Sequence, residues 1–483
     1  MSTLLKQKYE TVIGLEIHAH LKTKSKIFCN CPTDFGCPPN DNVCPVCMGL
    51  PGVLPVLNQK VVDFAILAAL ALKCTVSKKM KFDRKQYFYP DLPKNYQISQ
   101  YDMPVATNGR INISGKNIRI NRIHLEEDAG KLVHAGSDGL AGSTYSLVDY
   151  NRTGVPLIEI VSEADLRSAE EARIFMSELR NILRYLGICD GNLEEGSLRC
   201  DANISVRPYG QEKFGTKVEV KNMNSFKALQ KALEHEESRL MELSELGEEI
   251  VQETRLWNDE TGTTSSMRTK EYAHDYRYFP EPDLLPYLIN EDYVNKLKEQ
   301  MPELPEAKRT RYQQKLGLSE YDANVIVDSQ DISLFFDKIV NMEVNAKAAA
   351  NWLMGDITYY LKENKINLEQ TKLTPESLFE MISMIDNNKI SNNIGKKVLI
   401  ELIEKGGSPS KIVEKMGLSL ITDENELEQL VKQVLTDNPQ QVEKYKAGKT
   451  GLIGFFVGQI MKTTKGKAEP KLVNDLLKKE LDN

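Results

Sequence analysis

The chain has 483 residues, of which 41% are hydrophobic and 27% charged, and its formal net charge is −7 at pH 7. This length exceeds what one hydrophobic core supports, so the sequence predicts two to four domains. The negative net charge argues against a surface coated with basic residues. The N-terminus has no apolar signal segment, and the longest apolar stretches are too short to span a bilayer. We therefore expect a cytoplasmic protein that does not contact the membrane.

The first 285 residues alternate between strand and helix patterns. Tyr9–His20 alternates between an apolar face and a polar face that carries Glu16 and His18, and Leu198–Arg207 and Lys217–Lys221 alternate in the same way. Such alternation is typical of half-buried strands in antiparallel sheets. The sequence thus predicts a sheet with one apolar face and one charged face.

Segments with helical spacing lie between these strands. Ser168 and Glu171 form a capping box ahead of an apolar-periodic run that ends at Gly187. Asn58–Leu72 and Ser225–Leu243 have helical spacing as well. We expect a helix in each of the three segments.

Toward the C-terminus the pattern becomes mostly helical, and Lys405–Ser410, with two glycines and a proline, is typical of a linker. The sequence therefore predicts an α+β fold in three parts: a mixed and antiparallel-sheet domain at 1–289, an all-helical domain at 290–405, and a small helical tail domain at 406–483. Residues 441–483 contain nine lysines and five acidic residues, a local net charge of +4.

Four cysteines have the spacing of a zinc knuckle. Cys29 and Cys31 form one close pair, and Cys44 and Cys47 form a second pair after twelve intervening residues. Two close pairs joined by a short loop can place four thiolates at the corners of a tetrahedron, as Zn²⁺ prefers, and such a site leaves no position for a substrate. A reducing cytosol favours a metal over disulfides. We therefore expect a structural zinc ion, with Cys37 outside the ligand set.

Three predicted strand segments carry acidic residues, and two of them also carry histidine. Ile123–Asp128 holds one histidine and three consecutive acidic residues, and a glutamate interrupts the apolar run Pro156–Glu163. That glutamate must be paired, metal-bound or part of a site, because burying a lone carboxylate is too costly. Carboxylates with one imidazole suit Mg²⁺ or Mn²⁺, although a charged strand face is more often simply solvated. The candidate catalytic residues of these segments are Glu16, His18, Glu126, Glu127, Asp128 and Glu159.

Two further polar segments could hold a charged substrate. Asp83–Asp91 mixes cations with aromatic rings, which suits phosphate and ring contacts, and Val220–Ser225 runs from a strand end into a helix start, which suits an anion. A surface loop and an ordinary helix cap explain the two segments equally well. The candidate catalytic, substrate-binding and ATP-binding residues here are Arg84, Lys85, Tyr87, Lys221, Asn222 and Asn224.

Seven long motifs are spread over essentially the whole chain: Val12–His18, Lys81–Pro90, Leu125–Lys131, Asp149–Glu159, Glu194–Ser205, Asp275–Asp283 and Val457–Lys462. Together they resemble the B subunit of the bacterial tRNA-dependent amidotransferases, the aspartyl/glutamyl-tRNA amidotransferase family. In that family a cradle domain carries the active site, and a helical domain and a helical tail that grips the tRNA follow it. Some members lack the cysteine quartet, so the resemblance implies that zinc is not needed for catalysis.

The resemblance implies a two-step ligase reaction. The enzyme would use ATP and Mg²⁺ to phosphorylate the side-chain carboxylate of glutamate or aspartate misacylated onto tRNA, and ammonia would then displace the phosphate. The A subunit, an amidase, would release the ammonia from glutamine and deliver it through a tunnel, and a small C subunit would complete a heterotrimer. No serine-hydrolase elbow occurs in the chain, which agrees with glutamine hydrolysis lying in the partner.

Carried onto this sequence, the resemblance implies that His18, Glu127 and Glu159 ligate Mg²⁺, with Glu16 close to them. Strand alternation places Glu127 opposite its two acidic neighbours, so the periodicity leaves open which face holds the metal. The resemblance also implies that Lys85 pairs with Glu127 near the tunnel exit. The residues expected to line the same pocket are Arg199, Asp201 and Asn203.

A second interpretation is a non-catalytic scaffold that contains zinc and binds tRNA. The zinc knuckle, the aromatic and basic loops and the lysine-rich tail would suffice for such a protein. Glu159 and the pair Glu16 and His18 favour the enzyme, because a scaffold does not require them. The sequence leaves open whether Glu-tRNA, Asp-tRNA or both are substrates.

Overall fold

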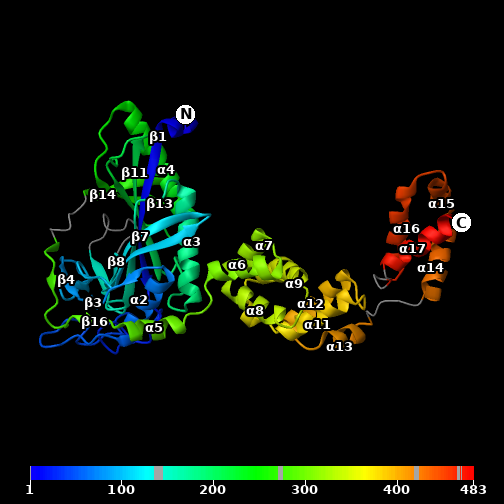
Figure 1. The fold of residues 1–483 in the computed structure, drawn as a ribbon, viewed down its shortest axis with the longest axis horizontal. Helices are drawn as coiled ribbons and strands as arrows, with labels where there is room; N and C mark the ends of the chain where they lie inside the picture. Colours follow the sequence, from blue (N-terminus) through cyan, green and yellow to red (C-terminus); the bar gives the residue numbers. More distant parts are fainter. Residues whose placement is uncertain are drawn as a thin grey trace. The chain divides into compact units, whose positions relative to one another are not determined.

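The computed structural model describes residues 2–134, 145–269, 276–417, 424–464, 468 and 470–482. It consists of two compact units, Met1–Leu304 and Pro305–Asn483 (Figure 1). The first unit is built on a mixed sheet and the second is helical, so the α+β class predicted from the sequence is confirmed. The three-part division with boundaries at 289 and 405 stays a prediction. Asp275, the first residue of one motif, lies outside the described residues.

A nine-stranded sheet forms the centre of the first unit. Its strands lie in the order β14 (Thr263–Thr269), β13 (Glu253–Asn258), β12 (Val218–Lys221), β11 (Leu198–Pro208), β1 (Tyr9–His20), β10 (Pro156–Ser162), β7 (Lys116–Glu127), β6 (Ala106–Ile113) and β2 (Thr75–Val76). Neighbouring strands are antiparallel except β12 and β13, which are parallel. The three alternating segments of the sequence are β1, β11 and β12, and they are neighbours in this sheet.

Three smaller sheets accompany the large one. They consist of β15 (Phe279–Pro280), β4 (Asp83–Gln86) and β5 (Tyr96–Ser99); of β16 (Tyr287–Leu288) and β3 (Lys79–Met80); and of β8 (Lys131–His134) and β9 (Ser146–Asp149). Strand β5 contacts β7 of the large sheet. The small sheet with β4 and β5 therefore lies beside the strand that carries the three consecutive acidic residues.

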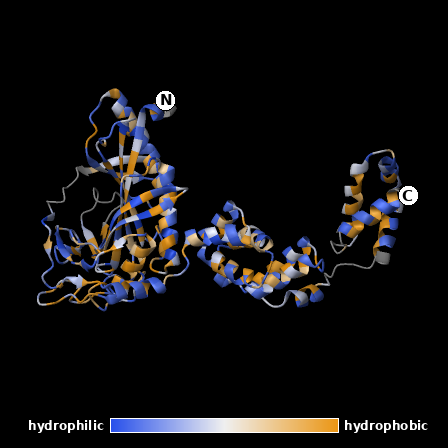
Figure 2. Ribbon diagram, in the orientation of Figure 1, coloured by the Kyte–Doolittle hydropathy of each residue, from blue (hydrophilic) through white to orange (hydrophobic). Residues whose placement is uncertain are grey.

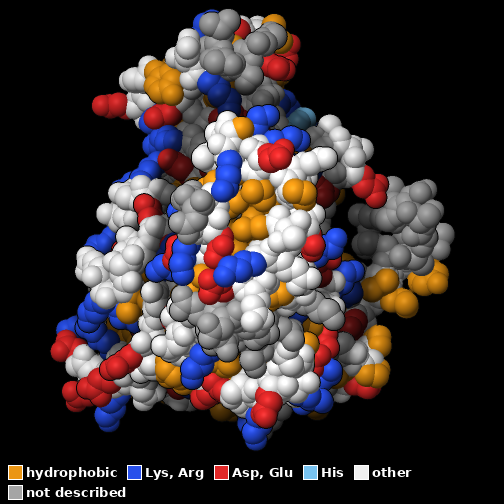
Figure 3. All heavy atoms as spheres, turned by 90° about the vertical axis from the view of Figure 1, so that its right-hand side faces the viewer, with side chains coloured by type: hydrophobic (Ala, Val, Ile, Leu, Met, Phe, Trp, Pro, Cys, Tyr) orange, Lys and Arg blue, Asp and Glu red, His pale blue; other side chains and the backbone are white. Residues whose placement is uncertain are grey.

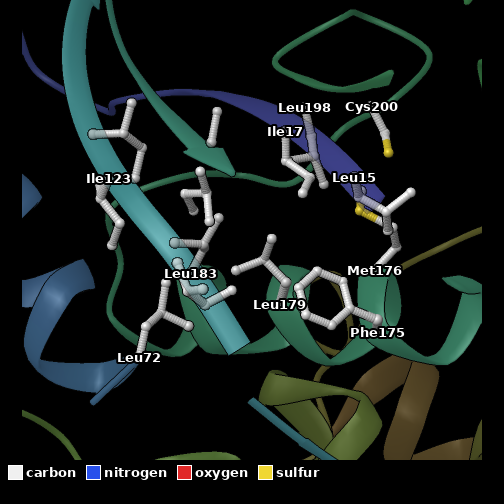
Figure 4. Close-up of a cluster of buried hydrophobic side chains, with 14 of the residues drawn as sticks. Leu15, Ile17, Leu72, Ile123, Phe175, Met176, Leu179, Leu183, Leu198 and Cys200 are labelled. Carbon is white, nitrogen blue, oxygen red and sulfur yellow. The ribbon is translucent and has the colours of Figure 1, made fainter. Parts of the chain in front are cut away.

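One face of the large sheet is apolar and forms the core with the helices α2 (Gln59–Ala71), α3 (Ala169–Tyr185) and α4 (Phe226–Leu246). A short helix, α1 (Ser2–Lys8), precedes β1. Burying each large apolar side chain stabilises the fold by roughly 1.5–3 kcal/mol. This packing fixes which face of each strand points inward. Figure 4 shows buried side chains of this core, among them Leu15, Ile17, Leu72, Ile123, Phe175, Met176, Leu179, Leu183, Leu198 and Cys200.

All three helices predicted for this unit are present, and each begins directly after a capping side chain. Ser168, Asn58 and Ser225 each accept a hydrogen bond from a backbone amide in the first turn of their helix. Helix α4 runs to Leu246, three residues beyond the predicted end. It ends there because Gly247, with φ of 70°, takes the left-handed conformation that closes a helix without steric cost.

The chain after β16 is helical, as the sequence predicts. Its helices are α5 (Glu291–Glu299), α6 (Pro305–Leu316), α7 (Glu320–Asp328), α8 (Gln330–Val340), α9 (Ala346–Trp352), the π-helix η2 (Leu353–Ile357), α10 (Thr358–Asn364), the 3₁₀ turn η3 (Leu368–Gln370), α11 (Pro375–Asp386), α12 (Asn392–Lys405), α13 (Pro409–Lys415), α14 (Glu424–Asp437), α15 (Pro439–Lys446), the 3₁₀ turn η4 (Thr450–Leu452), α16 (Ile453–Thr463) and α17 (Pro470–Asp482). Helix α13, which follows the predicted linker, contacts α11 and α12. Helices α14, α16 and α17 share a small hydrophobic core of their own.

The distribution of hydrophobic and charged residues agrees with this architecture. Figure 2 shows hydrophobic residues alternating with hydrophilic ones along the helices of the second unit. On the face drawn in Figure 3, Lys and Arg side chains are interspersed with Asp and Glu rather than gathered into one basic field. Within the described part of the chain, no helix combines the length and apolar character needed to cross a membrane.

Candidate functional site

A row of four polar side chains crosses the middle of the large sheet. Arg199 on β11 is paired with His18 on β1, His18 with Glu159 on β10, and Glu159 with His124 on β7. Direct cross-strand partners project to the same face of a sheet. This face is opposite the hydrophobic core. The polar residues that alternate with apolar ones along these strands therefore lie together on it.

The side chains in and beside this row form a compact group. Glu159 Oε2 lies 3.2 Å from His18 Nε2 and 3.3 Å from His124 Nε2. Glu126 Oε1 lies 3.5 Å from His18 Nε2, and Glu126 Oε2 lies 3.7 Å from His124 Nε2. Donor atoms of Glu16, His18 and Glu159 lie within 4.8 Å of one another, as do those of His124, Glu126 and Glu159. We call these five residues the acid–histidine cluster.

The carboxylates of the cluster stabilise protonated imidazoles. Burial disfavours the charged ring of His18, but its contact with Glu159 and the charge of Glu126 raise the pKa of His18 to about 9. Burial acts on His124 in the same direction, and the charges of Glu159 and Glu126 raise its pKa to about 9 as well. In return, although burial favours their neutral forms, His124 and His18 lower the pKa values of Glu126 and Glu159.

Glu16 shows the opposite shift. Burial and the negative charge of Glu159 raise the pKa of Glu16. The cluster holds three carboxylates and two imidazoles, and Arg122, 3.7 Å from Glu159, and Lys85 add positive charge around them. A divalent cation that displaces the imidazole protons would be held by oxygen donors and one or two neutral imidazoles, which match the ligands that Mg²⁺ and Mn²⁺ accept. The residues present therefore fit a hard divalent metal ion.

Glu127, one of the residues predicted to join this cluster, lies elsewhere. Its carboxylate oxygens lie 2.5 and 2.7 Å from Lys94 Nζ, and Oε1 accepts a hydrogen bond of 2.9 Å from the Ile98 amide. It is the carboxylate of Glu126 that faces the imidazoles. Strand alternation alone did not decide which of Glu126 and Glu127 faces the histidines. The resemblance predicted that Glu127 pairs with Lys85, whereas in the structure Glu127 pairs with Lys94.

Asp128 follows in the loop after β7 and contacts one histidine and two arginines. Its Oδ2 lies 2.6 Å from His20 Nε2, 3.0 Å from Arg199 Nη2 and 3.3 Å from Arg152 Nε. Burial favours the neutral acid, but Arg199, His20 and Arg152 hold the pKa of Asp128 well below its usual range. Asp128 is therefore an anion that orients Arg199 at the edge of the cluster.

Lys85 projects from β4 toward the same carboxylates. Although burial disfavours its charged form, the negative charge of Glu126 raises the pKa of Lys85, and Glu159 contributes in the same direction. Its ammonium lies 4.9 Å from the ring centroid of Tyr276 and 5.6 Å from that of Tyr87. The aromatic and basic segment thus contributes one cation to the surroundings of the acid–histidine cluster.

Arg84, the neighbour of Lys85 on β4, is engaged in a different contact. It donates to both carboxylate oxygens of Glu281, at 2.7 and 2.8 Å, and stacks 4.3 Å from the ring centroid of Tyr96. Arg84 and Tyr96 line a cavity of about 210 Å³, to which Glu127 also contributes. Alternation along β4 places Arg84 and Lys85 in separate surroundings.

The remaining predicted substrate residues lie on β11 and at the end of β12. Asp201 is the cross-strand partner of Glu16, and its carboxylate contacts Lys221. Asn203 is two residues farther along β11, opposite Glu219 of β12. Burial disfavours the charged form of Lys221, but Asp201 raises its pKa. Asp201 and Lys221 therefore extend the charged face beyond Glu16.

The residues that follow Lys221 lead into helix α4 and include its N-cap. Asn222 donates to the Trp257 carbonyl at 3.0 Å, and Ser225 accepts from the Ala228 amide at 3.0 Å as the cap of α4. Asn224 is exposed beside that cap. The ordinary helix-cap interpretation thus explains Ser225, and a substrate role of Asn222 and Asn224 stays a prediction.

The four cysteines predicted to bind zinc converge. The sulfur atoms of Cys29, Cys31, Cys44 and Cys47 lie within 4.8 Å of one another, and those of Cys44 and Cys47 are 3.9 Å apart. Four zinc–sulfur bonds of about 2.3 Å place sulfur atoms about 3.8 Å apart in a tetrahedron. All eight cysteines of the chain are free thiols. The quartet therefore fits a zinc ion, and Cys37 is not among these four.

Several residues of the site were not predicted individually from the sequence. His124 shares the face of Glu126 because the two are two positions apart, so strand alternation could have identified it. Lys94 and Arg152 come from loops, where no periodicity reveals the direction of a side chain. Ser99 donates to Glu126 Oε2 at 3.1 Å from the neighbouring β5, a contact that depends on strand pairing.

Residues 11–295, the unit that holds this cluster, match the family model of the GatB/GatE catalytic domain, and residues 334–481 match that of the GatB domain. The sheet unit thus belongs to the class of GatB/GatE catalytic domains.

Relatives that match this chain over nearly their full length show to which family within this class it belongs. Proteins named as the B subunit of aspartyl/glutamyl-tRNA(Asn/Gln) amidotransferase are 57% identical in Synechococcus sp. (strain JA-2-3B'a(2-13)), 55% in Crocosphaera subtropica and 54% in Acaryochloris marina. The alignments cover 99%, 100% and 99% of this chain and 98%, 99% and 98% of the relatives. The chain therefore belongs to the family of aspartyl/glutamyl-tRNA amidotransferase B subunits, which confirms the resemblance carried by the sequence motifs.

Proposed function

We propose that this protein is the activating subunit of a tRNA-dependent amidotransferase. It transfers the γ-phosphoryl group of ATP to the side-chain carboxylate of glutamate or aspartate misacylated onto tRNA, and the activated group is then amidated with ammonia. Family membership supports this function. The observation that carries it is the convergence of Glu16, His18, Glu126 and Glu159 from three strands onto one polar face.

The two chemical steps balance without a protein nucleophile. A carboxylate oxygen of the substrate forms a bond to the γ-phosphorus as the bond to the β–γ bridging oxygen breaks, which gives ADP and an acyl phosphate. Ammonia then attacks the carbonyl carbon, the bond to the phosphate oxygen breaks, and the nitrogen loses a proton, which leaves an amide and inorganic phosphate. Phosphoryl transfer depends mainly on positioning and charge stabilisation, which agrees with a site of acids, histidines and cations.

In this proposal Glu16, His18 and Glu159, with Glu126 beside them, hold Mg²⁺ or Mn²⁺. Bound there, the ion would neutralise charge that develops on the transferred phosphoryl group. Glu126 takes the place that the sequence predicted for Glu127, because the Glu126 carboxylate faces His18 and that of Glu127 contacts Lys94.

The cations around the cluster would serve the anionic substrates. Lys85 faces Glu126 and Glu159, and Arg199 is held beside His18 by Asp128. Both cations can attract phosphate oxygens, and Arg199 can also orient a carboxylate. We expect Lys85 and Arg199 to position ATP and the aminoacyl group against each other.

The same proposal includes the remaining components. Zn²⁺ bound by the four cysteines is structural, since four thiolates leave no position for substrate. An amidase, the A subunit, supplies ammonia, a small C subunit completes the complex, and lysines within 441–483 contact the tRNA phosphates. The reaction takes place in the cytoplasm, where aminoacyl-tRNA is available.

The test is reconstitution of the reaction. The protein is incubated with the A and C subunits, glutamine, γ-labelled ATP and either Glu-tRNA(Gln) or Asp-tRNA(Asn), and amidated aminoacyl-tRNA and released phosphate are measured. We expect both products to depend on ATP and on the misacylated tRNA. A complex that binds the tRNA but forms no amide and cleaves no ATP would favour the scaffold interpretation, in which this chain has no catalytic role.

A further inference from the structure

Lys26 is a buried lysine that contacts one of the four cysteines. It lies between the end of β1 and Cys29, and its side chain is fully buried. The Nζ atom donates to the Asn42 carbonyl at 2.7 Å, contacts the Tyr150 carbonyl at 3.4 Å and lies 3.6 Å from Cys47 Sγ. Lys26 thus contacts the cysteine loop, residues 29–47, and through the Tyr150 carbonyl it also contacts a second segment of the chain.

The direct contacts of Lys26 in the described part of the chain include no carboxylate, and the atom able to carry an opposite charge beside its ammonium is Cys47 Sγ. Among the described residues, no carboxylate forms an ion pair with its ammonium, and the two carbonyl oxygens are neutral. A buried ammonium without an opposite charge is strongly destabilising. A zinc ion with four thiolates carries a net charge of −2, and Cys47 is one of these thiolates. The filled site would therefore place a fixed negative charge in direct contact with the Lys26 ammonium.

The second segment leads directly to the acid–histidine cluster. It consists of residues 149–154, from the last residue of β9 to two residues before the start of β10. Asn40 and Asn42 of the cysteine loop hydrogen-bond with it: Tyr150 N donates to Asn40 Oδ1 at 2.8 Å, and Asn42 N donates to Asn151 Oδ1 at 2.8 Å. Arg152, in the same segment, reaches Asp128 at 3.3 Å.

Gly154 shows how closely this segment approaches the cysteine site. Its φ is +80°, and a Cβ atom at this position would meet Lys26 Cδ at 3.5 Å and Cys47 Cβ at 3.6 Å. The Ile27 amide donates to the Gly154 carbonyl at 3.0 Å. Lys26 therefore lies where the cysteine loop, the 149–154 segment and the start of β10 meet.

We propose that Lys26 is the charge partner of the zinc–tetrathiolate site and that its ammonium fastens this site to residues 149–154. The proposal rests on the zinc binding proposed above and not on the amidation reaction. Groups that hydrogen-bond to metal ligands commonly contribute 10- to 100-fold to metal affinity. Lys26 is thus a positioning residue for the metal and for the segment that leads to Glu159.

Zinc retention tests the proposal directly. Zinc content is measured by elemental analysis, and zinc release into a chromogenic chelator is followed over time, for wild-type protein and for Lys26→Met, which keeps length and removes charge. We expect about one zinc per wild-type chain and release at least about tenfold faster from the variant. The matched control is Lys308→Met, which removes a buried lysine paired with Asp337 in the second unit and should leave zinc release unchanged.

Two further variants separate charge from packing. Lys26→Gln keeps a donor for the Asn42 carbonyl but no charge, so it should also release zinc faster; release at the wild-type rate would overturn the proposal. If Lys26→Met does not accumulate as folded protein, Lys26→Gln decides alone. Cys44→His replaces one thiolate by a neutral ring and so makes the zinc site less negative. This change should weaken zinc binding less in Lys26→Met than in wild-type protein, because Lys26→Met has no ammonium to interact with that negative charge.

The second half of the proposal has its own readout. Limited proteolysis and hydrogen exchange of residues 149–154 should increase in Lys26→Met at least as much as in zinc-depleted wild-type protein, and not in Lys308→Met. Wild-type protein that contains no zinc would contradict the metal proposal itself. Wild-type protein that holds zinc, with Lys26→Met holding it equally tightly, would contradict only the role of Lys26.

Discussion

Glu126 and Glu127 follow each other in β7, yet their carboxylates lie in different surroundings. Glu126 lies 3.5 Å from His18, whereas Glu127 forms an ion pair of 2.5 Å with Lys94. Successive side chains of a strand point to opposite faces, so adjacent identical residues can serve separate tasks. Here one glutamate joins the proposed metal site, and the other helps to line the cavity beside the cysteines.

The first prediction uses this pair as a matched comparison. Glu126→Gln keeps the size of the side chain and removes the charge proposed to hold the metal, so tRNA-dependent ATP cleavage should fall at least about 100-fold. Glu127→Gln should reduce ATP cleavage much less, because its carboxylate contacts Lys94 instead. Phosphate release by the reconstituted complex measures both. A larger loss for Glu127→Gln than for Glu126→Gln would contradict the placement of the metal.

The second prediction concerns Glu159, whose carboxylate lies between the two imidazoles. In Glu159→Gln, ATP cleavage should fall by orders of magnitude, because the central negative charge of the cluster is lost. Amidation from glutamine and amidation from free ammonia should fail together, since activation precedes both. Basal glutamine hydrolysis by the partner needs no phosphate chemistry and should persist. Ammonia-dependent amidation at the normal rate would place the function of Glu159 outside activation.

The third prediction concerns the lysines within 441–483. Lys444, Lys446 and Lys449 are exposed, and changing all three to Gln should raise the apparent KM for tRNA and leave ATP affinity unchanged. Each phosphate contact contributes roughly 0.7–0.9 to the slope of log affinity against log salt, so the slope should become shallower by up to about 2–3. Filter binding at several salt concentrations measures this change.

A variant with the same loss of charge elsewhere serves as the control. Lys227, Lys296 and Lys298 are exposed lysines of the first unit, and their joint change to Gln removes three charges as well. The salt slope should stay near that of the wild-type protein. Equal effects of the two triple variants would mean that tRNA responds to overall charge and not to the tail.

The fourth prediction concerns thiol reactivity. Burial raises the pKa values of Cys74 and Cys189 to about 12, so at pH 8 only about one in 10⁴ of these thiols is the reactive thiolate. Zinc-loaded protein treated with iodoacetamide at pH 8 should react first at Cys37, which is partly exposed and outside the quartet. The thiolate fraction of Cys74 and Cys189 rises about tenfold per pH unit below 12, so their alkylation should accelerate accordingly toward pH 10.

Removing the metal completes this measurement. After treatment with a zinc chelator, the four cysteines of the quartet should become reactive, and mass spectrometry of the peptides should show four additional alkylated sites. Added zinc should restore protection. Four reactive cysteines before chelation would contradict zinc binding by this quartet.

The sequence determined much of this protein by itself. The alternation of Tyr9–His20 and Leu198–Arg207 predicted two half-buried strands, because burial of one face requires a period of two. The cap at Ser168 predicted the start of α3, and the cysteine spacing predicted the convergence of four thiols. These are local properties, which depend on residues close together in the chain.

Only the tertiary structure decided how the site is assembled. Strand alternation could not choose between Glu126 and Glu127, because the choice depends on which face of β7 packs against the core. Pairing of Glu127 with Lys94 and of Lys26 with the cysteine loop brings together residues from different loops and strands. Such contacts arise from strand order and register, which bring distant segments together and which no short stretch of sequence contains.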